Sequence, residues 1–104
     1  MADHGRILAV DDTPASLKLL TELLQAEGYV VRSAIQGELA LQSALIDPPE
    51  LVLLDIRMPG MDGFEVCRRL KAAPVTAHIP IIFVSALTDT EDKVRGFGLG
   101  AVDF

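Results

Sequence analysis

The chain has 104 residues, of which half are hydrophobic, and it carries a formal net charge of −6 at pH 7. This length is sufficient for one domain with a single core, and the hydrophobic content argues against a disordered chain. Apolar runs of four or five residues are too short to span a membrane, and the acidic balance argues against nucleic acid as a direct ligand. The single cysteine, Cys67, cannot form an internal disulfide, which favours a reducing cytoplasm.

Short apolar runs alternate with segments of helical spacing along the chain. In chain order we expect a strand over 7–10, a helix from Pro14 that Gly28 ends, a strand over 29–31, a helix over 38–45, a strand over 51–54, a helix that Asp62 begins, a strand over 81–84, a helix over 91–100 and a strand that starts at 102–104. This alternation predicts a doubly wound α/β fold with a parallel sheet and helices on both faces. The fourth helix should be the least stable, because Gly96, Gly98 and Gly100 each cost about 1 kcal/mol relative to alanine within a helix.

Capping residues mark the beginnings of two of these helices. Thr13 is predicted to be the N-cap of the first helix, with a proline at the first helical position, so that Asp11 and Asp12 are left free for an ion. Asp62 is predicted to be the N-cap of the third helix, because Glu65 follows it at the spacing of a capping box.

Carboxylates and a hydroxyl follow three of the predicted strands: Asp11 and Asp12 the first, Asp55 the third and Ser85 the fourth. The carboxyl ends of parallel strands meet at one edge of a sheet, which is where ligands bind. Taken singly, such residues are more often turn or cap residues. Gathered at one edge, like charges would raise one another's pKa unless a cation intervened, and their hard oxygens favour Mg²⁺. A carboxylate beside such an ion can attack phosphorus, and Ser85 could donate a hydrogen bond to the phosphoryl oxygens.

Four stretches of the sequence resemble the receiver domain of two-component response regulators. They are VDD at 10–12, LLDIRMPGMDGFEV at 53–66, PIIFVSA at 80–86 and GAVDF at 100–104. The resemblance covers essentially the whole chain, which implies that residues 1–104 form one receiver domain of flavodoxin-like fold.

The resemblance also implies a role for individual residues. Asp55 would accept a phosphoryl group from a histidine kinase or a phosphotransfer protein in a Mg²⁺-dependent reaction. The implied ion ligands are Asp11, Asp12, Asp55 and the backbone carbonyl of Arg57, and the implied switch residues are Ser85 and Phe104. The domain would act as a cytoplasmic signalling module rather than a metabolic enzyme, and its fourth helix and fifth strand would control a downstream effector domain or protein.

The sequence departs from the family pattern at its end. Receiver domains usually carry a Lys-Pro pair after the aromatic residue that matches Phe104, followed by a fifth helix, and the chain stops before both. We therefore expect a fragment of a longer protein, truncated at the start of the fifth strand and lacking the C-terminal helix. The apolar faces that this helix would cover could promote a homodimer.

Two other functions stay open at this point. The missing lysine region favours a docking or dimerisation module that keeps the fold without switching. A phosphohydrolase with an aspartate nucleophile after the first strand is the second alternative, although Asp-Asp-Thr at 11–13 lacks the Asp-x-Asp spacing that such enzymes need.

Overall fold

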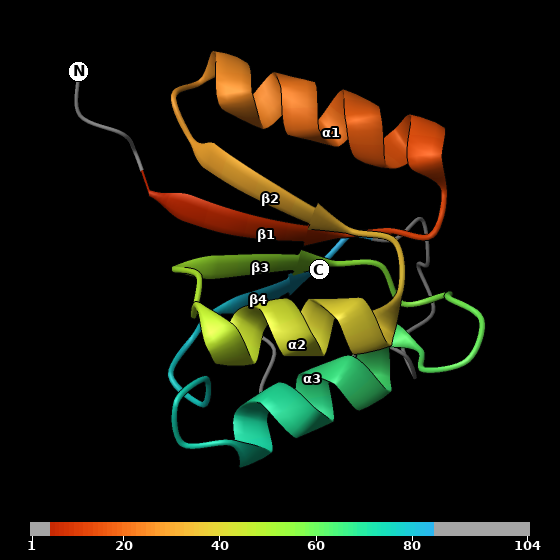
Figure 1. Ribbon diagram of the computed structural model, residues 1–104. Helices are drawn as coiled ribbons and strands as arrows, with labels where there is room; N and C mark the ends of the chain where they lie inside the picture. Colours follow the sequence, from red (N-terminus) through yellow and green to blue (C-terminus); the bar gives the residue numbers. More distant parts are fainter. Residues whose placement is uncertain (1–4, 85–104) are drawn as a thin grey trace.

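A computed structural model describes residues 5–84 of the chain. Its elements are β1 Arg6–Val10, α1 Pro14–Ala26, β2 Val30–Ala34, α2 Gly37–Ile46, β3 Leu51–Leu54, α3 Gly63–Ala72 and β4 Ile81–Phe83 (Figure 1). The predicted fourth helix and fifth strand, together with Ser85 and Phe104, lie outside the described residues. Among the helices of 5–84, none is long and apolar enough to cross a membrane.

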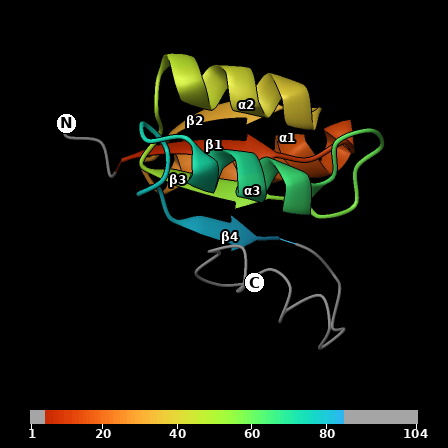
Figure 2. The ribbon, with the colours of Figure 1, turned by 90° about the horizontal axis from the view of Figure 1, so that it is seen from below.

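The described strands form one parallel sheet in the order β2-β1-β3-β4. Helix α1 lies on one face of the sheet, and α2 and α3 lie on the other (Figure 1, Figure 2). This arrangement confirms the predicted α/β fold. The last residue of β1, Val10, is in register with Ala34 of β2 and with Leu54 of β3. The residues that follow β1 and β3, which include the predicted site residues, are therefore neighbours.

The main core lies between the sheet and the layer formed by α2 and α3. Alternate residues of β3, Val52 and Leu54, point into this core and are fully buried. Phe83, the last residue of β4, packs edge-to-face on Phe64 of α3, with ring centroids 5.3 Å apart. Because Phe64 lies in the first turn of α3, this contact holds the start of the helix beside the edge at which the strands end.

Strand β2 extends to Ala34, beyond the apolar run at 29–31 that the sequence predicts. It pairs in parallel along the whole of β1. The prediction missed the second half of β2 because Arg32 and Ser33 are polar. Polar residues are tolerated there because β2 is at the edge of the described sheet. Before it, Gly28 ends the α1 segment as predicted, with a φ of 94° that favours glycine.

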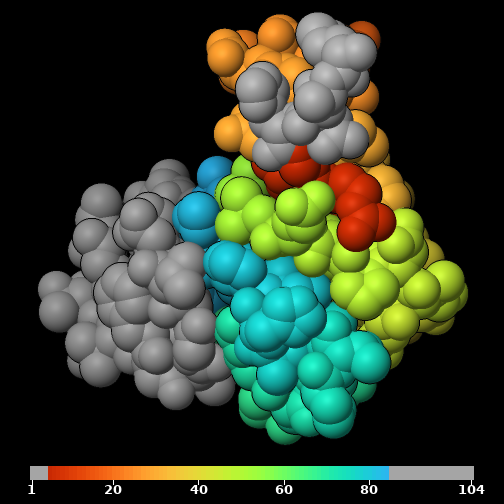
Figure 3. Space-filling view, turned by 90° about the vertical axis from the view of Figure 1, so that its left-hand side faces the viewer, coloured from red at the N-terminus to blue at the C-terminus, as the bar shows by residue number. Residues whose placement is uncertain are grey.

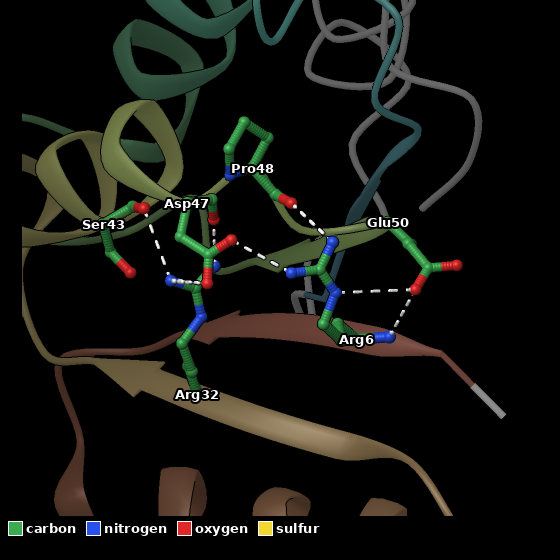
Figure 4. A network of polar contacts seen from close by, with 6 residues as sticks. All are labelled: Arg6, Arg32, Ser43, Asp47, Pro48 and Glu50. Carbon is green, nitrogen blue, oxygen red and sulfur yellow. Dashed lines mark hydrogen bonds and ion pairs between the residues drawn. The ribbon is translucent and has the colours of Figure 1, made fainter. Parts of the chain in front are cut away.

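Two arginines bind the turn between α2 and β3 (Figure 4). Arg6 Nη1 lies 3.0 Å from Asp47 Oδ1, and Arg32 Nη1 lies 3.6 Å from Asp47 Oδ2. Arg32 also donates hydrogen bonds to the carbonyl oxygens of Ser43 and Asp47 at the end of α2. Figure 3 looks at this end of the molecule, where the start of β1 (red) lies against the turn before β3 (green). The network satisfies terminal carbonyls of α2 and ties that helix to β1 and β2.

Candidate metal and phosphoacceptor site

The backbone ladder of the sheet continues past the strand ends and fixes the acidic residues that follow them. The Asp11 N–H donates to the carbonyl of Ala34 at 3.1 Å, and the Asp55 N–H donates to the carbonyl of Val10 at 2.9 Å. Asp11 is thus held against β2 and Asp55 against β1. Because Val10 immediately precedes Asp11, the second bond places Asp55 beside the acidic pair.

Asp11, Asp12 and Asp55 form one carboxylate cluster. Each offers an oxygen atom, these atoms all lie within 4.8 Å of one another, and all three residues are half-buried. Such a set of hard oxygen donors, still open to solvent, fits Mg²⁺, which retains several waters and needs one or two carboxylates. The structure therefore brings together the three aspartates that the sequence predicted as ion ligands.

Asp55 titrates well above the usual range of an aspartate. Its pKa is raised from 3.8 to about 6, mainly by burial and then by the negative charge of Asp11, with a further contribution from Asp12. Hydrogen bonds from the backbone of Arg57 and Ile56 act in the opposite direction and lower the pKa. A cation among the three carboxylates would offset the repulsion that the metal-free cluster carries.

We expect ionised Asp55 to destabilise the metal-free protein. Between pH 4 and pH 6 the folded state binds a proton that the unfolded state has lost, so the free energy of unfolding decreases as the pH rises through this window. The variant Asp55→Asn should consequently be more stable than wild type at pH 7 in the presence of a chelator. This advantage should shrink as the pH approaches 4, and urea unfolding at both pH values measures it. An advantage of equal size at both pH values would contradict the assignment.

Thr13 occupies the predicted N-cap position of α1, but the prediction that its side chain caps the helix is wrong. Thr13 is the N-cap residue and Pro14 follows at the first helical position, but the Thr13 side chain makes no capping hydrogen bond. The Thr13 N–H instead donates to Asp11 Oδ1 at 2.9 Å. Asp11 is therefore not left free: one of its oxygens holds the turn into α1. The signal for this turn is an aspartate two residues before the bonded N–H, a common Asx-turn spacing.

The first residue of α3, Gly63, packs against the backbone of Asp55. The predicted N-cap is confirmed, because the Glu65 N–H donates to Asp62 Oδ1 at 2.9 Å. The Glu65 carboxylate accepts hydrogen bonds from Arg68 and Arg69, which lower its pKa to about 2. Between Asp55 and this helix, the side chain of Met58 is buried and anchors the connecting loop.

The remaining predicted site residues are placed less completely. Arg57 is exposed, two residues beyond Asp55, and the role of its carbonyl as an ion ligand stays a prediction. Ser85 and Phe104 lie outside the described residues. Val84, the last described residue, lies at the carboxyl edge of the sheet beside Asp55. Its N–H donates to the carbonyl of Leu54, the residue before Asp55, at 3.0 Å.

Comparison with known proteins gives consistent matches. The family model described as response regulator receiver domain matches residues 7–104. Response regulator PleD of Caulobacter vibrioides is 50% identical over 100 residues, which are 96% of this chain and 22% of the relative. The DNA-binding dual master transcriptional regulator RpaA of a Synechocystis species is 40% identical over 99 residues, which are 95% of this chain and 41% of the relative. The chain thus spans less than half the length of either.

A solved structure of the chemotaxis protein CheY4 of Vibrio cholerae agrees with the fold. It superposes with a TM-score of 0.93 at 30% sequence identity, and the match covers 98% of this chain and 84% of that one. The sheet order and the acidic edge described above therefore occur on a scaffold that known proteins share.

Proposed function

This chain belongs to the response regulator receiver domain family, and from that premise we propose that Asp55 accepts a phosphoryl group from a histidine kinase or a phosphotransfer protein. The observation that carries the proposal is the convergence of Asp11, Asp12 and Asp55 within 4.8 Å at the carboxyl edge of a parallel sheet. Burial, and after it the negative charges of Asp11 and Asp12, raise the pKa of Asp55 to about 6, so its carboxylate is largely ionised at pH 7. It can therefore serve as a nucleophile under neutral conditions.

The transfer step follows from the position of Asp55. One of its carboxylate oxygens forms a bond to phosphorus while the N–P bond of the phosphohistidine breaks. The electron pair of that bond stays on the imidazole nitrogen, which takes up a proton from solvent. Hydrogen bonds from the backbone of Ile56 and Arg57 orient the attacking carboxylate. Mg²⁺ held by the aspartates and by the carbonyl of Arg57 would neutralise charge on the phosphoryl oxygens in the loose transition state.

We assign the response to phosphorylation to Ser85 and Phe104, which lie outside the described residues. Ser85 would donate a hydrogen bond to the new phosphoryl oxygens, and Phe104 would turn toward the space that Ser85 leaves. Such a change shifts the population of states, because the phosphoryl group favours the state that it contacts better. A surface formed by the fourth helix and fifth strand would then act on an effector domain or protein in the cytoplasm.

Uptake of a phosphoryl group by the wild-type chain tests this function. Incubation with Mg²⁺ and a small phosphodonor, such as an acyl phosphate or phosphoramidate, should add the mass of one phosphoryl group. Hydroxylamine should remove the group, because it cleaves acyl phosphates, and a chelator should prevent its addition. A chain that gains no mass at any Mg²⁺ concentration would favour the non-switching docking module.

A further inference from the structure

Gly63, the first residue of α3, lies directly against the backbone of Asp55. A Cβ atom at this position would be 2.3 Å from the carbonyl oxygen of Asp55 and 2.8 Å from the Cα of Ile56. Both distances are far below ordinary van der Waals contact, and both atoms belong to the backbone, which cannot move aside as a flexible side chain could. Glycine is therefore required here by space.

The same residue is also bonded to the segment that it touches. The Gly63 N–H donates to the carbonyl of Ile56 at 2.9 Å. The Ile56 and Arg57 backbone, in turn, provides the hydrogen bonds to the Asp55 carboxylate. A continuous set of contacts therefore runs from the start of α3 to the oxygen atoms of the phosphoacceptor.

The start of α3 is fixed from its other side as well. Asp62 caps the helix through the Glu65 N–H, and the side chains of Phe64 and Val66 are buried in the core. An added methyl group at residue 63 would consequently displace the Asp55–Ile56 peptide or pull α3 out of its packing.

We propose that Gly63 is a positioning residue for Asp55. By allowing the first turn of α3 to close on the Asp55–Ile56 peptide, it sets the direction in which the Asp55 carboxylate meets an ion and a phosphoryl donor. This inference rests on the proposed function of Asp55 as phosphoacceptor. It assigns to α3 a role in the geometry of transfer, in addition to its role in the core.

Gly37 provides a matched control for this residue. It is the first residue of α2 and is also buried, and a Cβ atom there would lie 2.7 Å from the carbonyl oxygen of Met61 and 2.8 Å from Cγ2 of Val66. The steric conflict is of the same kind, but the atoms that it involves belong to Met61 and Val66 and not to the Asp55–Ile56 backbone. Gly37→Ala therefore reports the cost of crowding at a helix start without contact with the phosphoacceptor.

The test compares Gly63→Ala and Gly37→Ala with wild type in three measurements. Urea unfolding should show that both variants lose stability. Backbone amide resonances of Ile56 and Arg57 in the metal-free proteins should shift more in Gly63→Ala than in Gly37→Ala. At saturating Mg²⁺, the rate of phosphoryl uptake should fall at least about tenfold in Gly63→Ala alone, since a small misplacement of a reacting group costs up to about a hundredfold. Equal uptake rates and equal amide shifts in the two variants would overturn the proposal.

A second pair of variants decides the matter if Gly63→Ala does not fold. Asp62→Ala removes the cap that holds the start of α3, whereas Asp62→Asn retains a capping oxygen. Asp62→Ala should shift the Ile56 and Arg57 amide resonances and slow phosphoryl uptake, and Asp62→Asn should do neither. Identical behaviour of the two would contradict the proposal. The amide shifts do not depend on phosphorylation, so a wild-type chain that takes up no phosphoryl group would overturn the function of Asp55 and still leave the role of Gly63 measurable.

Discussion

Replacing Asp55 with asparagine is expected to abolish phosphoryl uptake while the fold is retained. Asparagine has nearly the shape of aspartate, so the backbone bond from the Asp55 N–H to Val10 and the packing around it should persist. The amide oxygen cannot form the acyl phosphate, because it lacks the negative charge of the nucleophile. The measurement is the intact mass of the chain after incubation with Mg²⁺ and a small phosphodonor, together with a circular dichroism spectrum that reports folding.

Two further variants make the result specific. Glu38→Gln removes an exposed carboxylate from the first turn of α2, outside the cluster, and should leave uptake unchanged. Asp12→Asn keeps the nucleophile but removes one ion ligand, so uptake should require a higher Mg²⁺ concentration and should recover when enough is added. If Asp55→Asn is labelled as fast as wild type, another residue is the acceptor and the proposed function of Asp55 is wrong.

The sequence predicted the limits of β3 but not those of β2, which lies at an edge of the described sheet. The apolar run at 51–54 coincides with β3 because β3 is paired on both sides and packed against the core. The run at 29–31 missed most of β2, whose Arg32 points toward the end of α2 and whose Ser33 is exposed. An edge strand needs fewer apolar residues, so its limits are set by hydrogen bonds to β1, which the sequence alone does not display.

The acidic cluster was predictable for a different reason. Parallel strands place their carboxyl ends at one edge, so the positions of Asp11, Asp12 and Asp55 after two apolar runs were enough to bring them together. The bond from the Thr13 N–H to Asp11 was missed, because threonine at an N-cap and aspartate in an Asx turn fit the same local pattern.

The sequence alone does not show whether backbone conformation or lack of space favours glycine at positions 60 and 63. Gly60 has a φ of 75°, and nothing lies within 4 Å of the Cβ position, so backbone conformation is what favours glycine there. Gly63 is needed because the Asp55 carbonyl occupies the space of its Cβ atom. The lack of space at Gly63 depends on which strand end α3 packs against. It can therefore be recognised only from the tertiary structure.

The largest effect on stability is expected from Phe83→Ala. Phe83 is fully buried at the end of β4, in register with Leu54, and its ring packs edge-to-face on Phe64 at an interplanar angle of 70°. Truncation removes the buried ring, opens a cavity and ends the aromatic contact, so the free energy of unfolding should fall by about 3–5 kcal/mol. Small domains have about 5–15 kcal/mol in total, and the variant should therefore unfold at a much lower urea concentration.

Ile46→Ala is the matched control for this loss, since it shortens a large apolar side chain that is 84% exposed at the end of α2. Its free energy of unfolding should change by no more than about 0.5 kcal/mol. Under conditions in which Phe83→Ala is folded, phosphoryl uptake should persist, because the bonds from the Asp11 and Asp55 N–H groups remain. It should be slower than in wild type, because the start of α3 loses its aromatic contact. A loss below about 1 kcal/mol would mean that the layer of α3 is not held to the sheet by this aromatic pair. Contacts other than this pair would then have to hold the start of α3 in the position that the proposed role of Gly63 requires.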